Sequence, residues 1–162
     1  MKIRLLDVNV LVSLLDSAHV FHQLAVLWFH TMAVTEGWAT CPITENGFVR
    51  VVSSVNYPNF RLTPAMAAKS LASFKAGFPG VHHFWRDEVS VADTAVFDLT
   101  CLTGSRQTTD TYLAGLAFHN GGRLTTLDGG VQWRAVRGAT ADLVDQIGPG
   151  ANQAESSEKP QL

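Results

Sequence analysis

Residues 4–12, RLLDVNVLV, begin as a strand-like apolar run and continue as a helix-like one, with Asp7 at the junction. Three more acidic residues lie at comparable points: Glu45 in CPITENGFVR, Asp110 in TTDTYLAGLAF and Asp128 in LTTLDGG. Each follows a strand-like run or lies in the first turn of a predicted helix. Carboxylates pressed together without a cation raise one another's pKa, so a cluster of them is typical of a metal site or an acid/base pair.

Outward from this stretch, strands and helices alternate along the chain. We predict strands at residues 2–6, 38–41, 81–85 and 123–128, with a possible edge strand at 139–144. We predict helices after Asp7 and at residues 19–34, 42–55, 64–77, 91–102 and 110–120. Crossover helices of this length imply an α/β fold of three layers, with a mostly parallel sheet of four to five strands and helices on both faces.

The predicted topology bears directly on the four acids. Ligands of open parallel sheets bind outside the carboxyl ends of the strands, and the four acidic side chains are expected to converge there. Any one of them alone is more often a helix N-cap or a solvated turn residue. Their joint arrangement favours a metal site.

Size and composition predict one globular domain. The chain has 162 residues, of which 46% are hydrophobic, which suits a single core over residues 1–147. Residues 148–162 have almost no apolar content, so we predict a disordered C-terminal tail.

The sequence also bears on the cellular compartment. Cys41 and Cys101 lack the close spacing of a zinc or redox pair, which favours buried free thiols in a reducing, cytoplasmic setting. No apolar run reaches the roughly 18 residues of a membrane span. The N-terminus imitates a secretory signal, but Asp7 and Asn9 interrupt its apolar stretch and leave that reading as a minor alternative.

The formal net charge of −2 does not point to a nucleic-acid partner. Setting the four candidate acids aside leaves 14 − 4 = 10 acidic residues against 12 Lys and Arg. This balance neither establishes nor forbids RNA binding. Arg50, on the helix that carries Glu45, is expected to contact RNA phosphate or a partner's carboxylate, with a plain surface ion pair as the alternative.

Other polar residues carry weaker signals. His19 and His22 have the spacing of one helix turn, but no third ligand for zinc is evident. His82 and His83 alternate across a strand and cannot easily face one ion. Asp93 belongs to an acidic patch. Its main interpretation is a solvated charge at the start of a helix, and the alternative is that it assists the acidic site.

Four short segments together resemble a known family. The segments D-V-N-V-L, T-E-N-G-F-V-R, T-D-T-Y-L-A-G-L-A and T-L-D, in this order, are similar to those of PIN-domain ribonucleases, and within them to VapC-type toxins of type II toxin-antitoxin pairs. The resemblance covers about residues 2–144 and implies a PIN-like fold. It matches Asp7, Glu45, Asp110 and Asp128 to the acidic metal-binding set, Asn9 to a supporting polar residue, and Thr109 and Thr126 to small hydroxyl residues beside the later acids.

The resemblance also implies an activity and partners: a Mg²⁺-dependent ribonuclease, with Mn²⁺ as a possible substitute, an RNA substrate, a cognate VapB-like antitoxin and a homodimer. Mg²⁺ prefers hard oxygen ligands, which suits carboxylates at a sheet edge. In this scheme Asp7 and Asp110 are the principal ligands, and Glu45 and Asp128 hold a second ion or orient metal-bound water. The number of ions stays open. One departure is Gly129-Gly130-Val131, where family members often have a basic or aromatic residue, and it bears on substrate contacts.

Alternative functions fit less well. A phosphatase-like hydrolase using Asp7 needs an acid two residues later, and that position is Asn9. A phosphoacceptor receiver domain needs a lysine at a late strand end, where this chain has none. A non-catalytic PIN-like binding module stays open, although the four-acid set argues against it.

Overall fold

The computed structural model describes residues 2–148 and contains one five-stranded sheet in which all neighbouring strands are parallel. Its order is β3-β2-β1-β4-β5. The strands are β1 (Arg4–Leu6), β2 (Trp38–Thr40), β3 (His82–Phe84), β4 (Arg123–Thr126) and β5 (Val144–Gln146). The prediction of an α/β fold with a parallel sheet of four to five strands is confirmed.

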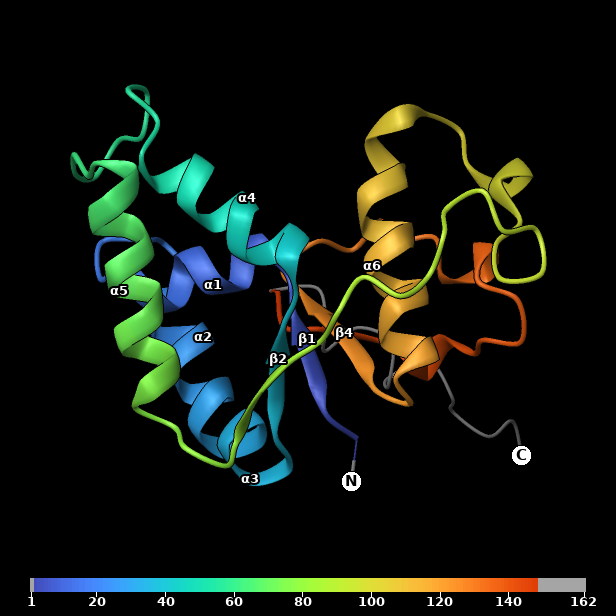
Figure 1. Ribbon diagram of the computed structural model, residues 1–162, viewed down its shortest axis with the longest axis horizontal. Helices are drawn as coiled ribbons and strands as arrows, with labels where there is room; N and C mark the ends of the chain where they lie inside the picture. The colour runs from blue at the N-terminus through green and yellow to red at the C-terminus, as the bar shows by residue number, and fades with distance from the viewer. Residues whose placement is uncertain (1, 149–162) are drawn as a thin grey trace, which may run out of the picture.

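Six α-helices connect the strands or cover the sheet (Figure 1). They are α1 (Val8–Leu15), α2 (His22–Trp28), α3 (Val34–Glu36), α4 (Pro42–Val52), α5 (Pro64–Ala76) and α6 (Thr108–His119). A π-helical turn, η1 (Phe29–Ala33), joins α2 to α3. Four 3₁₀ turns complete the described chain: η2 (Leu99–Cys101), η3 (Ser105–Gln107), η4 (Trp133–Ala135) and η5 (Ala141–Leu143).

The sheet separates two hydrophobic cores. Successive strand residues point to opposite faces, so Leu5 and Leu6, both fully buried in β1, enter different cores. Leu6 packs with residues of α1, α2, α4 and α5, whereas Leu5 packs with residues of α6 and of the segments that follow β4. Figure 1 shows α1 to α5 on one side of the sheet and α6 on the other, which confirms helices on both faces.

The connection order places a crevice at the end of β1. From β1 the chain proceeds through β2 to β3 on one side, whereas β4 and β5 lie on the other side. Such a reversal of strand order opens a crevice beyond the carboxyl ends of the two central strands, here β1 and β4. Asp7 directly follows β1, and Asp128 lies two residues after β4. The topology therefore brings these two acids together although 121 positions separate them, counted as 128 − 7.

The predicted helix at 91–102 is wrong. Within the described chain this stretch forms turns, the single 3₁₀ turn η2 and an antiparallel bridge from Phe97 to Val136. Asp93 accepts a hydrogen bond from the backbone N–H of Ala95, and Asp98 accepts one from that of Thr100. Such local bonds give the backbone an alternative to a helix.

Two smaller expectations also change. Cys41 is buried as predicted, but Cys101 is exposed, because the helix that would have buried it is absent. The edge strand expected at 139–144 is present as β5, but it begins only at Val144, after the turn η5.

Two expectations concern the ends of the structure and the membrane. Of the predicted C-terminal tail, residues 148–162, the structure describes only residue 148. The prediction that the tail is disordered therefore lies outside the described residues. Within residues 2–148, no helix has the length and apolar character needed to cross a bilayer.

Candidate metal and substrate site

Asp7 links the end of β1 to the start of α1. Its backbone is extended and its side chain caps α1, accepting a hydrogen bond of 2.7 Å from the backbone N–H of Val8. Its second carboxylate oxygen accepts a bond of 2.8 Å from the hydroxyl of Thr126, at the end of β4. Asp7 is only 6% exposed, and this burial raises its pKa, to which the charge of Asp128 adds.

Asn9 ties the first turn of α1 to the end of β4. Its side-chain NH₂ donates to the Thr126 hydroxyl at 3.0 Å and to an Asp128 carboxylate oxygen at 3.1 Å. Its carbonyl oxygen accepts from the backbone N–H of Leu127 at 3.1 Å. The Thr126 hydroxyl also accepts from the backbone N–H of Asp128 at 3.1 Å. The network thus orients Asp7 and Asp128 through the neutral side chains of Asn9 and Thr126, which add no charge repulsion.

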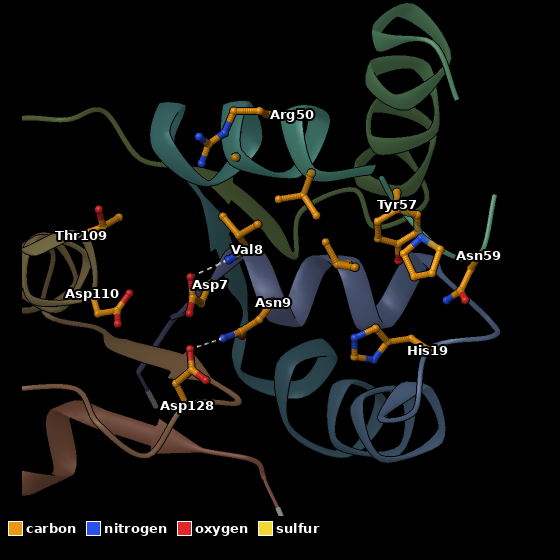
Figure 2. A pocket seen from close by; sticks show the side chains of 14 residues that line it. Asp7, Val8, Asn9, His19, Arg50, Tyr57, Asn59, Thr109, Asp110 and Asp128 are labelled. Atoms are coloured by element: carbon orange, nitrogen blue, oxygen red, sulfur yellow. Dashed lines mark hydrogen bonds between the residues drawn. The ribbon is translucent and has the colours of Figure 1, made fainter. Parts of the chain in front are cut away.

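Asp110 enters from the opposite face of the sheet, in the first turn of α6. Its pKa is raised to about 6, first by burial and then by the charges of Asp7 and Asp128. Figure 2 shows the three aspartates turned toward one opening from three different elements. Asp7 and Asp110 are therefore held where their negative charge is unfavourable, which a bound cation would correct.

The three aspartates line one side of a pocket of about 540 Å³. Asn9 and Thr109 lie beside them, and Arg50 reaches the pocket from α4 (Figure 2). The pocket then continues along α1 to four residues that the sequence did not place with the aspartates, namely His19, Tyr57, Pro58 and Asn59. Its volume lies in the range of about 300–1,000 Å³ that is typical of small-molecule sites.

The donor set suits a hard divalent cation, although it does not form a closed cage. Within residues 2–148, no group of three or more His, Cys, Asp or Glu side chains lies close enough together to hold a metal ion by itself. Mg²⁺ usually binds one or two carboxylates, keeps several waters and takes further oxygens from substrate phosphates. Asp7, Asp110, Asp128 and the carboxamide of Asn9 fit this partial mode of ligation.

Glu45 does not join this cluster, which corrects the expectation that all four acids share one pocket. It accepts a 2.5 Å hydrogen bond from the Thr40 hydroxyl and forms a 2.5 Å ion pair with Lys75 of α5. It lines a separate pocket of about 350 Å³ between α4 and α5. The reason is the phase of α4: Gly47 faces the aspartates, and at about 100° per residue Glu45 points some 200° away from it.

Arg50 lies one helical turn after Gly47 and therefore on the face of α4 that borders the aspartates. Together with Thr109 it also lines an adjoining hollow of about 420 Å³. Arg50 is exposed, and no acidic residue of the described chain pairs with it. The plain surface ion pair considered for Arg50 is thus not formed, and its guanidinium is available to an anionic ligand.

The remaining polar candidates do not form a second centre. The Nδ1 atom of His22 lies 2.8 Å from the backbone oxygen of Ser13, so this ring is used within the fold, and zinc ligation by His19 and His22 has no third partner in residues 2–148. His82 contacts the Thr40 hydroxyl at 2.9 Å, and its pKa is lowered to about 4 by burial and then by the charge of Lys75. Asp93 is exposed in its turn and lines none of the pockets described above.

Comparison with known proteins assigns the family. Ribonuclease VapC44 of Mycobacterium tuberculosis (strain H37Rv) is 45% identical over 136 residues, which cover 84% of this chain and 93% of that protein. Ribonuclease VapC39 of the same strain is 40% identical over 143 residues (88% and 98%), and Ribonuclease VapC38 is 42% identical over 127 (78% and 86%). No model of a known protein family matches the chain. At these identities over nearly the whole length of the relatives, the chain belongs to the VapC-type PIN-domain ribonucleases that its sequence resembles.

Proposed function

We propose that the protein is an endoribonuclease that hydrolyses RNA phosphodiester bonds with a divalent cation, Mg²⁺ or alternatively Mn²⁺, at Asp7, Asp110 and Asp128. One observation carries this proposal: three carboxylates from three elements face one pocket with no basic partner among the described residues, and the pKa values of Asp7 and Asp110 are raised. The VapC relatives, which are named ribonucleases, supply the reaction class.

Each residue has a distinct part in this scheme. Asp7 and Asp110 would hold the ion, and Asp128 would contribute a third carboxylate oxygen or accept a hydrogen bond from a water of the site. Asn9 and Thr126 keep Asp7 and Asp128 in position through the hydrogen bonds described above. When bound, the cation screens the anionic phosphate, lowers the pKa of water and stabilises the departing oxygen.

Arg50 is proposed to contact the substrate. A guanidinium binds a phosphate with parallel N–H donors, and Arg50 lies at the pocket's rim without an acidic partner. It would orient the RNA backbone and offset part of the charge that the aspartates and phosphate bring together. Glu45 is proposed to act at a distance from the chemistry, as the partner that fixes Lys75 between α4 and α5.

Family membership supports further proposals about cellular context. We propose that the ribonuclease is the toxin of a toxin-antitoxin pair, that a VapB-like antitoxin neutralises it, that it forms a homodimer and that it acts in the cytoplasm. An antitoxin segment carrying Arg or Lys would find complementary charge at the three aspartates.

The alternatives make different use of the same residues. In a phosphatase-like hydrolase, Asp7 would attack the phosphate directly and would need an acidic group two residues later, but that position is Asn9, whose neutral amide bonds to Thr126, Leu127 and Asp128. In a non-catalytic binding module, the three aspartates would catalyse no reaction. The geometry favours hydrolysis by a metal-activated water over both.

The test is cleavage of total RNA by the purified protein, with Mg²⁺ and with a chelator, followed by mapping of the new ends. We expect discrete cleavage that needs the cation and is lost in Asp7→Asn. Asp93→Asn, which changes an exposed acid outside the pocket, is the matched control and should cleave like the wild type. Equal cleavage by Asp7→Asn, or cleavage that persists in chelator, would contradict the proposed function.

A further inference from the structure

The pocket extends well beyond the three aspartates. From Asp7, α1 runs for eight residues, or about 12 Å at 1.5 Å per residue, before the chain reaches Asp16 and His19. A Mg²⁺ ion lies about 2.0–2.1 Å from its ligands, so the ion and its ligands fill only one end of this length. Figure 2 shows the aspartates at one end of the pocket and His19, Tyr57 and Asn59 at the other.

We propose that the far end of the pocket, formed by His19, Tyr57 and Asn59, binds the base of an RNA nucleotide close to the cleaved phosphate, and that Asp16 positions this subsite. The proposal rests on the proposed ribonuclease function, because it takes the aspartate end as the place of the phosphate.

A buried carboxylate builds this end of the pocket. Asp16, the C-cap of α1, is 2% exposed and accepts 2.5 Å hydrogen bonds from the Tyr57 hydroxyl and from the side-chain NH₂ of Asn59. It also accepts from the backbone N–H of Ala18 at 2.9 Å. These bonds fix the loop between α4 and α5 against the end of α1. Two of the three pocket residues, Tyr57 and Asn59, are thus held in place by one side chain.

The bond to Asp16 also determines how Asn59 presents its amide. An ionised carboxylate only accepts hydrogen bonds, so the NH₂ group of Asn59 must face Asp16. Its carbonyl oxygen receives no hydrogen bond from residues 2–148. Asn59 is exposed at the pocket wall, so this oxygen is available to accept from a ligand N–H.

His19 supplies the complementary group. Its Nδ1 accepts a 3.2 Å hydrogen bond from the backbone N–H of Phe21, so the proton of the neutral ring lies on Nε2. The wall therefore carries a free acceptor on Asn59 and a donor on His19. Each nucleobase presents a donor and an acceptor side by side on its Watson–Crick edge, which such a pair can contact in single-stranded RNA.

The rest of the pocket suits a base and its sugar. Val12 and Val51 contribute apolar surface from α1 and α4, and Tyr57 and Pro58 contribute flat surface at the far end. Tyr57 is braced by Phe60, with ring centroids 4.8 Å apart. Aromatic and apolar surfaces of this kind hold unstacked bases in RNA-binding proteins. Arg50 lines the same pocket and can take the connecting phosphate.

Binding without cleavage tests the subsite directly. The probe is a fluorescently labelled single-stranded RNA hexanucleotide pool, measured by anisotropy in chelator on the Asp7→Asn background. We expect Asn59→Ala to weaken binding at least about fivefold, the low end for a lost base contact. Asn56→Ala, an exposed asparagine of the same loop that lies outside the pocket, is the matched control and should bind like the parent. Equal affinity of the Asn59→Ala protein and its parent would overturn the proposal.

An abasic probe separates a base contact from a structural effect. In a hexanucleotide lacking the base beside the scissile phosphate, Asn59→Ala should cause no further loss, because the partner of Asn59 is already missing. An undiminished fivefold loss on the abasic RNA would overturn base recognition. His19→Ala is the second variant, since it leaves the Asp16 bonds intact and keeps the test valid if Asn59→Ala unfolds.

Mapping of cleavage ends distinguishes this proposal from the function beneath it. On a randomised RNA pool, the wild type should cut with a base preference at one position beside the cleaved bond. In Asn59→Ala and His19→Ala this preference should be lower, and the remaining cleavage should be slower than that of the wild type. Cleavage with unchanged preference in both variants would overturn the subsite and leave the ribonuclease function standing. Absence of any cleavage by the wild type would instead contradict the proposed function, while the binding result would still decide the subsite.

Discussion

Carboxylates lie near both sides of α4, but only those on one side have a basic partner within the described chain. On one face, Gly47 and Arg50 border a pocket in which Asp7, Asp110 and Asp128 have no basic partner within the described chain. On the other, Glu45 is neutralised by Lys75 at 2.5 Å. The three aspartates and Glu45 all lie near the edge of the sheet at which the strands end.

The difference shows that position at a sheet edge does not by itself make an acid functional. Glu45 has its counter-charge built into the fold, so it needs no ligand. The aspartates do not, and burial, followed by the charges of Asp7 and Asp128, raises the pKa of Asp110 to about 6. In the proposed function, a cation and a phosphate would bind where this unfavourable arrangement lies.

The largest predicted effect is on the rate of RNA cleavage, and it should distinguish Asp110 from Glu45. Asp110→Asn removes a proposed ligand and should lower RNA cleavage by more than about 100-fold, since even indirect support of a metal commonly contributes 10- to 100-fold. Glu45→Gln should cleave within about twofold of the wild type if its neighbourhood stays folded. The measurement is the single-turnover rate on one RNA. Equal losses of cleavage rate in the two variants would contradict the different roles proposed for Asp110 and Glu45.

A second prediction sharpens the role of Glu45. Lys75→Met removes the cation and leaves a carboxylate that is only 24% exposed, which should lower the free energy of unfolding by about 1–2 kcal/mol. Combining it with Glu45→Gln should recover much of this loss, because no charge is then left unpaired. Urea unfolding of the single and double variants measures the coupling. Strict additivity would contradict the ion pair's structural role.

A third prediction concerns the close packing that sets the phase of α4. A Cβ atom at Gly47 would lie 2.5 Å from a methyl group of Val8, so Gly47→Ala should push α4 from α1 and destabilise the protein by about 1 kcal/mol. Gly104→Ala is the matched control, because no atom lies within 4 Å and its φ of −172° is open to any residue. Thermal melting compares the two variants. Equal stability would contradict the close packing of α4 against α1 at Gly47.

The smallest expected effect is a pH dependence of the metal-free protein. Because the folded-state pKa of Asp110 is about 6 and the ordinary pKa of an aspartate is 3.8, folded protein binds this proton more tightly than unfolded protein does. Its contribution to stability is therefore present at low pH and is lost as pH rises from about 4 through about 6. In chelator, the melting temperature of the wild type should fall relative to Asp110→Asn over this range. A constant difference between them would contradict the raised pKa.

Much of the fold and part of the site could be predicted from the sequence. Asp7, Asn9 and Asp128 follow strands, and Asp110 opens a helix, so the rule that ligands bind beyond the strand ends was enough to bring them together. Thr126 and Thr109 were likewise expected at the site, and they lie beside these acids.

Glu45 was misplaced because its position depends on the phase of α4. The sequence shows that Glu45 lies in the first turn of a helix, but not which face of that helix meets α1. That face is set by the packing of Gly47 on Val8, a contact between distant segments. A shift of two residues around a helix is enough to move a side chain to the opposite side.

The far end of the pocket was missed for a different reason. Tyr57 and Asn59 belong to an irregular loop without hydrophobic periodicity, and both of their side chains are hydrogen-bonded to the distant Asp16. The helix wrongly predicted at 91–102 has a related cause, since aspartate side chains bond locally to the backbone there. In both places, side-chain hydrogen bonds decide the structure.

Direct binding of a divalent cation tests the central claim most directly. Titration of Mn²⁺, followed by water-proton relaxation, should show the same affinity in the wild type and Glu45→Gln, with at least about tenfold weaker binding in Asp7→Asn and Asp110→Asn. The account is contradicted if Glu45→Gln loses as much affinity as the two aspartate variants, or if all four proteins bind Mn²⁺ equally.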